Sequence, residues 1–467
     1  MLTKAKAEAI FKKLRWYTKA DELELLVSSS SSALTRFANN TIHQNVAEQE
    51  SAISLRVSFG RRTARAGTNK FDEDSLRRMI RSAEMLAKVQ EEDPDLLPMP
   101  TTEELKANVD QGTGGNVERY SESTAGFTAA DRANSVAQMV EVAQRNHLTA
   151  AGIFSTSESV EGILNSRGVN HWYQQTLAEA SITMLDSTSS GWQKANNQDV
   201  TQLDVKRMAE IAAEKARSSA VPRELAPGKY IVILEPAAVL DMVGFMFWDF
   251  SGSAVLEQRS FLNDRVGMQL FGSNVTVWDD VYHPLQLGIP YDGEGVRRRR
   301  IKLIEEGVVR NLTYSRASAR RMQASELAAK VGDVLPTGHG FALPNEAGEA
   351  PLNIVFSGLP AGQAQSVEQM IASTDRGILV TRLWYIREVD PYEKILTGMT
   401  RDGTFLVEGG RIISGIRNFR FNQSLIHMLR NIESMSDPVR ASGEESIDMV
   451  VPAMKVRDFN FTETTKF

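Results

Sequence analysis

Apolar side chains recur three and four positions apart in two long segments of the N-terminal half. In residues 72–88 they form one face of a predicted amphipathic helix, and Asp72 stands where a short polar side chain can cap its first N–H groups. Residues 128–146 have the same pattern, with Thr128 at the start of the predicted helix. Elsewhere in this half, apolar and polar residues alternate and are broken at turn signals such as Asn39-Asn40, which predicts strands.

These helices belong to a weak internal repeat. Its anchors, each pair 129 residues apart, are Ile53 with Ile182, Met79 with Met208, and Ala83 with Ala212. Each copy is predicted to run helix, three strands, helix. Two copies are too few for a solenoid, so we expect one layered N-terminal structure. The expected helices lie at about 3–18 and 72–88 in the first copy, and at about 128–146 and 201–217 in the second.

Two domains are expected from the change in sequence character near Val221-Pro222 to Pro227-Gly228. The segment Glu91–Gly126 between the two copies is rich in proline, glycine, threonine and acidic residues, which predicts a long surface connection. The predicted domains are 1–222, with the copies at about 1–90 and 128–220, and 223–467.

Strand and turn signals dominate the second domain. Tyr230–Leu234 is rich in β-branched residues, and Pro236 opens an apolar helix that extends to about Phe247. A late helix is expected at about 422–434, before an alternating terminal strand. The predicted fold class is therefore α+β, a duplicated α-β-β-β-α unit followed by a β-rich C-terminal domain. Turns are expected at Glu306-Gly307, Asp402-Gly403 and Gly409-Gly410.

The segment Val239–Phe250 is apolar on nearly all sides. Such a pattern is typical of a helix buried in a core, or between domains or subunits. Asp241 and Asp249 interrupt it, and it is too short to span a bilayer. We expect core packing first and a subunit contact second, and we expect no association with membranes.

Composition narrows the chemistry. The chain has no cysteine, which excludes disulfides, thiolate catalysis and cysteine-ligated zinc. Its net charge of −6 argues against binding nucleic acid through phosphate neutralisation. The first twenty residues lack the apolar run of a secretory signal, so a cytoplasmic location is expected.

No catalytic motif stands out. No two of the six histidines are three to five residues apart, so no helix carries the histidine pair of a zinc protease, and no G-x-S-x-G sequence is present. The glycine-rich Gln111–Asn116 lacks the lysine of a phosphate-binding loop. A site assembled from distant residues, His283, His339, Asp292 and Glu294, stays open as an alternative, although surface or turn positions are expected for the histidines.

Several stretches carry a family resemblance: FANNTIHQN with SLRVSFGRRTARAGTN, SFLNDRVGMQLF, PYDGEGVRRRRIKLIEEGVVRNLTYSRASARRM, REVDPYEKILTGMTRDGTFLVEGGRI and PAMKVRDF. In this order they resemble the TldD/PmbA (TldE) family, proteins long labelled modulators of DNA gyrase and now understood as zinc-metallopeptidase complexes. In the TldD branch, the resemblance implies a helix with the motif His-Glu-x-x-x-His and a distant cysteine, which together hold a zinc ion that activates water.

The resemblance places that motif in the apolar helix. Counting back from the SFLND stretch puts its first histidine at Val243, its glutamate at Gly244 and its second histidine at Trp248, with Asp249 next. The cysteine position falls near Ser442-Gly443. None of the expected ligands is present, which is similar to the PmbA/TldE branch.

The resemblance therefore implies a non-catalytic subunit that pairs with a TldD-like catalytic subunit. This chain would bind no cofactor, and zinc would belong to the partner. The pair would enclose a cleft for an extended peptide, with Val243, Gly244, Trp248, Asp249, Asp292 and Glu294 as candidate cleft or contact residues. The resemblance also leaves a homodimer open. The alternatives are a stand-alone hydrolase with an atypical site, and a protein-binding regulator linked to DNA gyrase.

Overall fold

A computed structural model describes residues 1–107, 117–332 and 334–465. Its N-terminal part has the same order of helix, three strands and helix twice over, as the repeat predicted. The first copy comprises α1 (Lys4–Tyr17), β1 (Glu22–Ala38), β2 (Thr41–Phe59), β3 (Arg62–Thr68) and α2 (Glu73–Val89). The second comprises α5 (Ala129–Arg145), β4 (Thr149–Asn165), β5 (Asn170–Leu185), β6 (Ser190–Asn197), the short η1 (Val200–Gln202) and α6 (Val205–Ser218).

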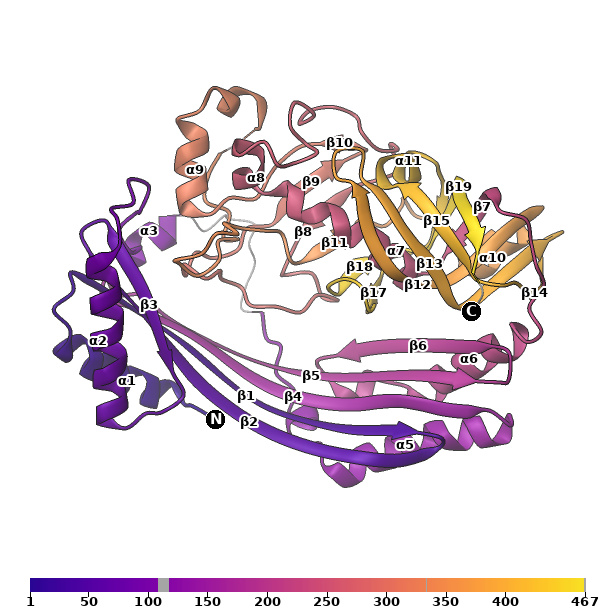
Figure 1. Cartoon of the computed structure of the whole chain (residues 1–467), viewed down its shortest axis with the longest axis horizontal. Helices are drawn as coiled ribbons and strands as arrows, with labels where there is room; N and C mark the ends of the chain where they lie inside the picture. The colour runs from indigo at the N-terminus through magenta and orange to yellow at the C-terminus, as the bar shows by residue number, and fades with distance from the viewer. Residues whose placement is uncertain (108–116, 333, 466–467) are drawn as a thin grey trace.

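The six strands form one antiparallel sheet in the order β3-β2-β1-β4-β5-β6. Its centre lies between the copies, where Ser30 of β1 faces Ser159 of β4, 129 residues further along the chain. The repeat offset and the strand register therefore agree on a pseudo-two-fold axis through this pair. Alternate side chains such as Leu23, Leu25 and Val27 are buried under the helices on one face, while the other face curves around the C-terminal half (Figure 1).

The connection between the copies lies largely at the surface, as predicted, but its described residues are more than a loop. It contains α3 (Thr102–Ala107) and α4 (Glu122–Ala125), and Met99 is fully buried. Arg119 donates to the main-chain oxygen of His283 at 2.9 Å, which ties the connection to the C-terminal half. The polar composition of the connection could not reveal these long-range contacts. The Gln111–Asn116 loop lies outside the described residues.

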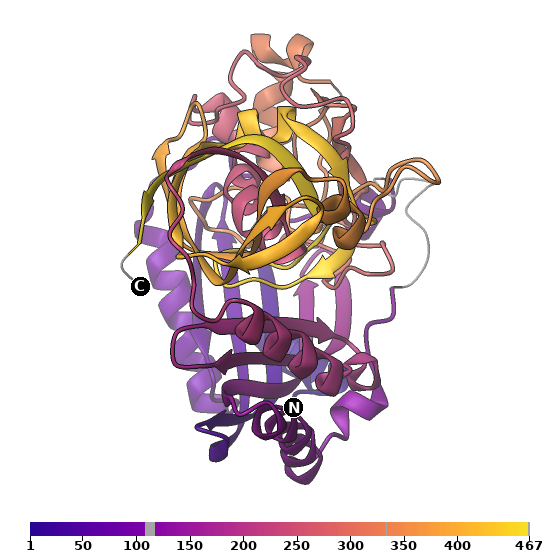
Figure 2. The same ribbon diagram turned by 90° about the vertical axis from the view of Figure 1, so that its right-hand side faces the viewer.

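The C-terminal half contains a strand barrel, seen as a ring in Figure 2. Strands follow the order β12-β7-β19-β15-β13-β14, and pairing of β12 with β13 closes the barrel. These strands are β7 (Gly228–Leu234), β12 (Arg376–Asp390), β13 (Ile395–Glu408), β14 (Arg411–Gly415), β15 (Phe419–Ser424) and β19 (Met454–Thr464), and β16 (Ile432–Met435) pairs with β19.

A second sheet packs beside the barrel in the order β10-β9-β8-β11-β18-β17. Its strands are β8 (Val277–Asp279), β9 (Ile301–Glu305), β10 (Val308–Val309), β11 (Ile354–Phe356), β17 (Val439–Ala441) and β18 (Met449–Val451). The helices of this half are α7 (Pro236–Val243), η2 (Gly244–Phe250), α8 (Gly252–Leu256), α9 (Arg316–Gln323), η3 (Glu326–Lys330), α10 (Val367–Ala372) and α11 (Leu425–Arg430). The structure and the predicted α+β class agree.

Two local predictions in this half were wrong. The expected helix at 422–434 shrinks to α11 between β15 and β16, because the buried Phe419 and Phe421 alternate with polar residues and pair into the barrel. The Asp402-Gly403 turn is instead a bulge inside β13, where both residues have positive φ and the register with β12 shifts.

The apolar segment is buried, as predicted. From Val239 to Met246 its large apolar side chains lie in the main C-terminal core, except Phe245, which is partly buried against it. None of the helices in the described part of the chain is long and apolar enough to cross a membrane.

Candidate functional site

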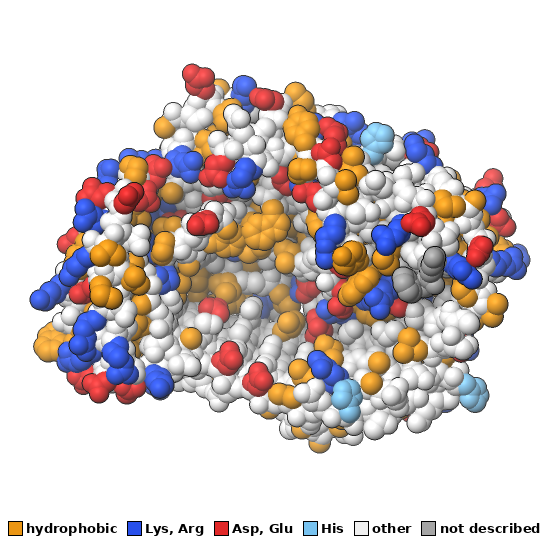
Figure 3. Space-filling model, in the orientation of Figure 1, with side chains coloured by type: hydrophobic (Ala, Val, Ile, Leu, Met, Phe, Trp, Pro, Cys, Tyr) orange, Lys and Arg blue, Asp and Glu red, His pale blue; other side chains and the backbone are white. Residues whose placement is uncertain are grey.

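A hollow separates the curved N-terminal sheet from the C-terminal half, and hydrophobic side chains gather on its wall (Figure 3). A cavity of about 440 Å³ lies between the two, bounded by Leu26 and Gln175 of the sheet and by Asp292 and Phe341 of the C-terminal loops. Tyr291 and Glu161 also line it, and the Tyr291 hydroxyl donates to the main-chain oxygen of Glu161 at 2.9 Å.

The predicted motif positions lie where α7 runs into η2. Val243 is fully buried, and Gly244 is packed so tightly that a Cβ atom there would lie 1.8 Å from Ser446 Oγ. Trp248 is 56% exposed and stacks on Phe341, with 6.0 Å between ring centroids. Phe341 also lines the cavity, so this stacking joins Trp248 to a residue of the cavity wall.

The segment around Ser442-Gly443 meets this helix. A Cβ atom on Gly443 would lie 2.3 Å from Asp241 Oδ1, and the N–H of Glu445 donates to the same oxygen at 3.2 Å. The two places where the family resemblance puts zinc ligands are thus in contact, although they are about 200 residues apart in sequence.

Asp249 anchors η2 through a buried ion pair. Lys394 Nζ lies 2.5 Å from Asp249 and 2.7 Å from Glu388, and the Lys394 side chain is only 3% exposed. The N–H of Phe261 donates to the other Asp249 oxygen at 3.1 Å. Burial raises the pKa of Asp249, although the Lys394 charge acts in the opposite direction.

Asp241 is buried with one oxygen unpaired, and burial raises its pKa to about 7. The unfolded chain binds fewer protons here between about pH 4 and pH 7, so this carboxyl lowers the free energy of unfolding as the pH rises through that window. Asp241→Asn is expected to raise the free energy of unfolding by about 1–2 kcal/mol at pH 8, because the amide carries no charge to bury.

Urea unfolding at pH 8 and pH 4 measures the free energy of unfolding of Asp241→Asn against wild type. The gain in stability should vanish at pH 4, where Asp241 is protonated in the folded wild type. Asp437→Asn, at an exposed position, is the matched control and should change neither value. A gain of equal size at both pH values would contradict the ionisation argument.

Asp292, which lines the cavity, and Glu294 form a buried acidic pair. Asp292 accepts hydrogen bonds from the N–H groups of Glu294, Val296 and Gly340, at 2.9, 2.9 and 2.8 Å. Glu294 accepts from the N–H of Arg316 at 3.0 Å, at the start of α9. Burial first, and the neighbouring Glu294 second, raise the pKa of Asp292 to about 7. Both carboxyls are committed to holding loops in place.

The two histidines of the atypical-site alternative serve separate local contacts. His339 is 1% exposed, so the expected turn or surface position was wrong for it. Its Nε2 lies 2.9 Å from Asp279, and its Nδ1 lies 3.0 Å from Thr337 Oγ1. His283 caps a turn, where its Nδ1 accepts from the N–H of Leu285 at 3.2 Å.

Metal-ligating side chains do not gather elsewhere in the described ranges. Within residues 1–107, 117–332 and 334–465, no three His, Cys, Asp or Glu side chains lie together in an arrangement that could hold a metal ion.

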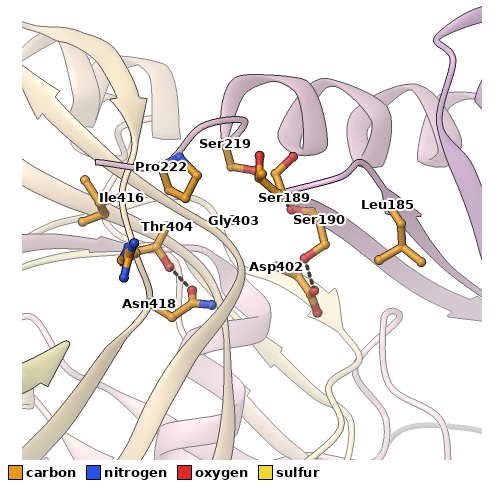
Figure 4. Close-up of a pocket in the computed structure, with 12 residues that line it drawn as sticks. Leu185, Ser189, Ser190, Ser219, Pro222, Asp402, Gly403, Thr404, Ile416 and Asn418 are labelled. Atoms are coloured by element: carbon orange, nitrogen blue, oxygen red, sulfur yellow. Dashed lines mark hydrogen bonds between the residues drawn. The ribbon is translucent and has the colours of Figure 1, made fainter. Parts of the chain in front are cut away.

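Sequence reasoning missed a cavity of about 310 Å³ between the two halves (Figure 4). On one side Ser190 donates to Asp402 at 2.6 Å, and on the other Thr404 donates to Asn418 at 3.0 Å. Asp402 also binds the buried Arg382 at 2.9 Å. In the sequence, the cavity residues Asp402 and Gly403 form an Asp-Gly pair within a long strand pattern, and this pair was interpreted as a turn.

Comparison with known proteins places the chain in a family. The PmbA/TldA metallopeptidase C-terminal domain matches residues 227–463, more than half of the sequence. Domain 1 of the same family matches residues 23–87, and its central domain matches residues 108–220. The chain belongs to the TldD/PmbA family.

Individual relatives are distant. Metalloprotease PmbA of Escherichia coli O157:H7 is 24% identical over 320 residues, which are 66% of this chain and 64% of that protein. An uncharacterized protein of Methanocaldococcus jannaschii is 28% identical over 178 residues, 38% of this chain and 42% of that protein. The matches thus span less than two thirds of either relative. The crystal structure of TldE from Thermococcus kodakarensis shares the fold, with a TM-score of 0.82 at 19% identity over 98% of this chain and 99% of that one.

Proposed function

We propose that this chain is the non-catalytic, TldE-like subunit of a TldD/TldE-type zinc metallopeptidase that processes peptides. One observation carries the proposal. The two segments expected to supply zinc ligands pack together, with Gly244 against Ser446 and Gly443 against Asp241, and the expected ligand positions carry Val243, Gly244, Trp248, Ser442 and Gly443. No side chain in this set has an imidazole or thiolate with which to hold zinc.

The packing at these positions also supports this role. Close contact of Gly244 with Ser446 and of Gly443 with Asp241 leaves no room for ligand side chains or an ion between the segments. A cluster of empty ligands would be costly to bury, whereas small and apolar residues fill the space without charge. The hollow, with Trp248 stacked on the cavity residue Phe341, then serves as one wall of a peptide cleft, and the catalytic partner supplies the other wall and the zinc.

The test is to purify the chain alone and together with the TldD-like protein of the same cell. We expect no stoichiometric zinc in the isolated chain by mass spectrometry of metals, and no hydrolysis of unfolded casein. With the partner we expect a complex of the two chains by light scattering, and hydrolysis that a chelator stops.

The matched control is the same complex with the motif glutamate of the partner replaced by glutamine, which should assemble but not hydrolyse casein. Chelator-sensitive hydrolysis by the isolated chain would refute the proposal and favour the atypical-site alternative.

A further inference from the structure

Half of β2 forms an open sheet edge. This strand pairs with β1 along its whole length, but with β3 only from Ile53 to Phe59. Residues 41–50 are exposed with the single exception of the half-buried Val46. No hydrogen bond from the described part of the chain reaches the outer main-chain groups of residues 41–52. An exposed edge of this length is a template for pairing with another strand.

The second repeat shows what this edge can bind. The equivalent stretch of β5 lies before its pairing with β6, which begins at Ala178. There an extended segment runs parallel to β5, with Arg119 beside Gln175, and the N–H of Thr176 donates to the Arg119 oxygen at 2.9 Å. The repeat offset places Ala47 at the position of Thr176, so the N–H of Ala47 points outward from the sheet.

The side chains at this edge are acidic on the hollow side. Glu48 and Glu50 share the face of Arg56, the concave face, and stand opposite Ser32 and Ser30 of β1. Both carboxylates are exposed, and neither forms an ion pair within the described ranges. Arg36, opposite Gln44, is the basic residue at the far end of this stretch.

We propose that the outer edge of β2, residues 44–50, binds an extended peptide with basic side chains as an added strand. Main-chain hydrogen bonds to residues such as Ala47 give the affinity, and Glu48 and Glu50 select lysine or arginine. The inference rests on the proposed function, because the added strand continues the floor of the peptide cleft. A second copy of this chain fits less well, because antiparallel pairing of two such edges brings four glutamates onto one face.

Ala47→Pro removes the outward N–H, and a proline is tolerated on an edge strand when that N–H faces solvent. Ala47→Val, which keeps the N–H, is the matched control. The probe is a fluorescein-labelled decapeptide of alternating lysine and threonine, compared with one of alternating glutamate and threonine, measured by fluorescence anisotropy with the full chain.

We expect the lysine peptide to bind about tenfold more tightly than the glutamate peptide, and Ala47→Pro to weaken it about tenfold while Ala47→Val leaves it unchanged. The double variant Glu48→Lys/Glu50→Lys, at exposed positions, should reverse the preference, and it tests the proposal independently if Ala47→Pro fails to fold. Equal binding of the lysine peptide by wild type and a folded Ala47→Pro, or no preference between peptides, would overturn the proposal.

Light scattering distinguishes peptide binding from the alternative, in which a second copy of this chain occupies the edge. A homodimer that Ala47→Pro dissolves would assign the edge to a second copy and would also overturn the proposal. These binding measurements use the isolated chain, so their failure leaves partner-dependent, chelator-sensitive hydrolysis intact as the separate test of the proposed function.

Discussion

Gly244→Ala is expected to lower the free energy of unfolding by about 3 kcal/mol, because the added methyl has no room. Its Cβ would lie 1.8 Å from Ser446 Oγ and 2.5 Å from Ser446 Cβ, in the contact between α7–η2 and the segment 442–446. Gly244 has helical φ and ψ of −57° and −28°, so alanine strains no backbone here and the cost is steric alone. Urea unfolding monitored by tryptophan fluorescence measures it.

The rescue is Ser446→Gly, which removes both clashing atoms and leaves Met449 Cε as the nearest neighbour at 3.5 Å. In the double variant Gly244→Ala/Ser446→Gly we expect most of the lost stability to return, while Ser446→Gly alone should cost less than about 1 kcal/mol. If the double variant instead loses as much unfolding free energy as the two single variants together, the two segments are not in the contact described.

Lys394→Met is expected to lower the free energy of unfolding by about 3–4 kcal/mol at pH 8, because it leaves Asp249 and Glu388 without their cation. The loss should shrink toward pH 5. Without Lys394 the pKa of Asp249, already raised by burial, rises further, so Asp249 takes up a proton and no longer buries a charge.

Lys394→Met/Asp249→Asn is the companion variant, in which the buried charge is removed together with its partner. We expect it to recover at least half of the loss at pH 8. Guanidinium unfolding at pH 8 and pH 5 measures the free energy of unfolding of each variant. An equal loss at both pH values would mean that Lys394 acts through packing of its aliphatic stem. Because this pair anchors η2, the same variants report on how firmly Trp248 is held.

Much of the architecture could be predicted because its signals are local. The helices α2 and α5 have their caps at Asp72 and Thr128, as predicted, since a cap and a helical apolar face depend on neighbouring residues only. The repeat offset was equally robust. The structure adds the strand order and the sheet centre at Ser30 and Ser159, which the offset alone does not give.

The errors arose where long-range pairing overrode local preference. Asp402 and Gly403 have the composition of a hairpin turn, but β13 continues through them because β12 lies alongside and Arg382 binds Asp402. The residues before α11 likewise join the barrel as strand β15, through pairs with β13 and β19. No window of the sequence contains the partner strands, so composition alone could not decide these cases.

For the candidate site, the positions of the residues were easier to predict than their surroundings. Counting along the family stretches led to Gly244 and to Ser442-Gly443, and the structure brings these places together. Counting along the sequence could not reveal that His339 lies against Asp279, or that Asp292 and Glu294 hold loops through main-chain N–H groups. Such contacts join residues that are far apart in sequence, and they follow only from the packed fold.

The pairing of β1 with β4 has a consequence for how the chain is made. When β1 and β2 leave the ribosome they can form a hairpin at once, but the other edge of β1 must wait for β4, which starts only at Thr149. The first repeat can pair its own three strands, but the two halves of the sheet cannot join until β4, which ends at Asn165, has been synthesised. Nascent chains of this protein therefore carry a long unsatisfied edge on β1 until β4 has emerged, and during this interval the edge can associate with other unfinished chains.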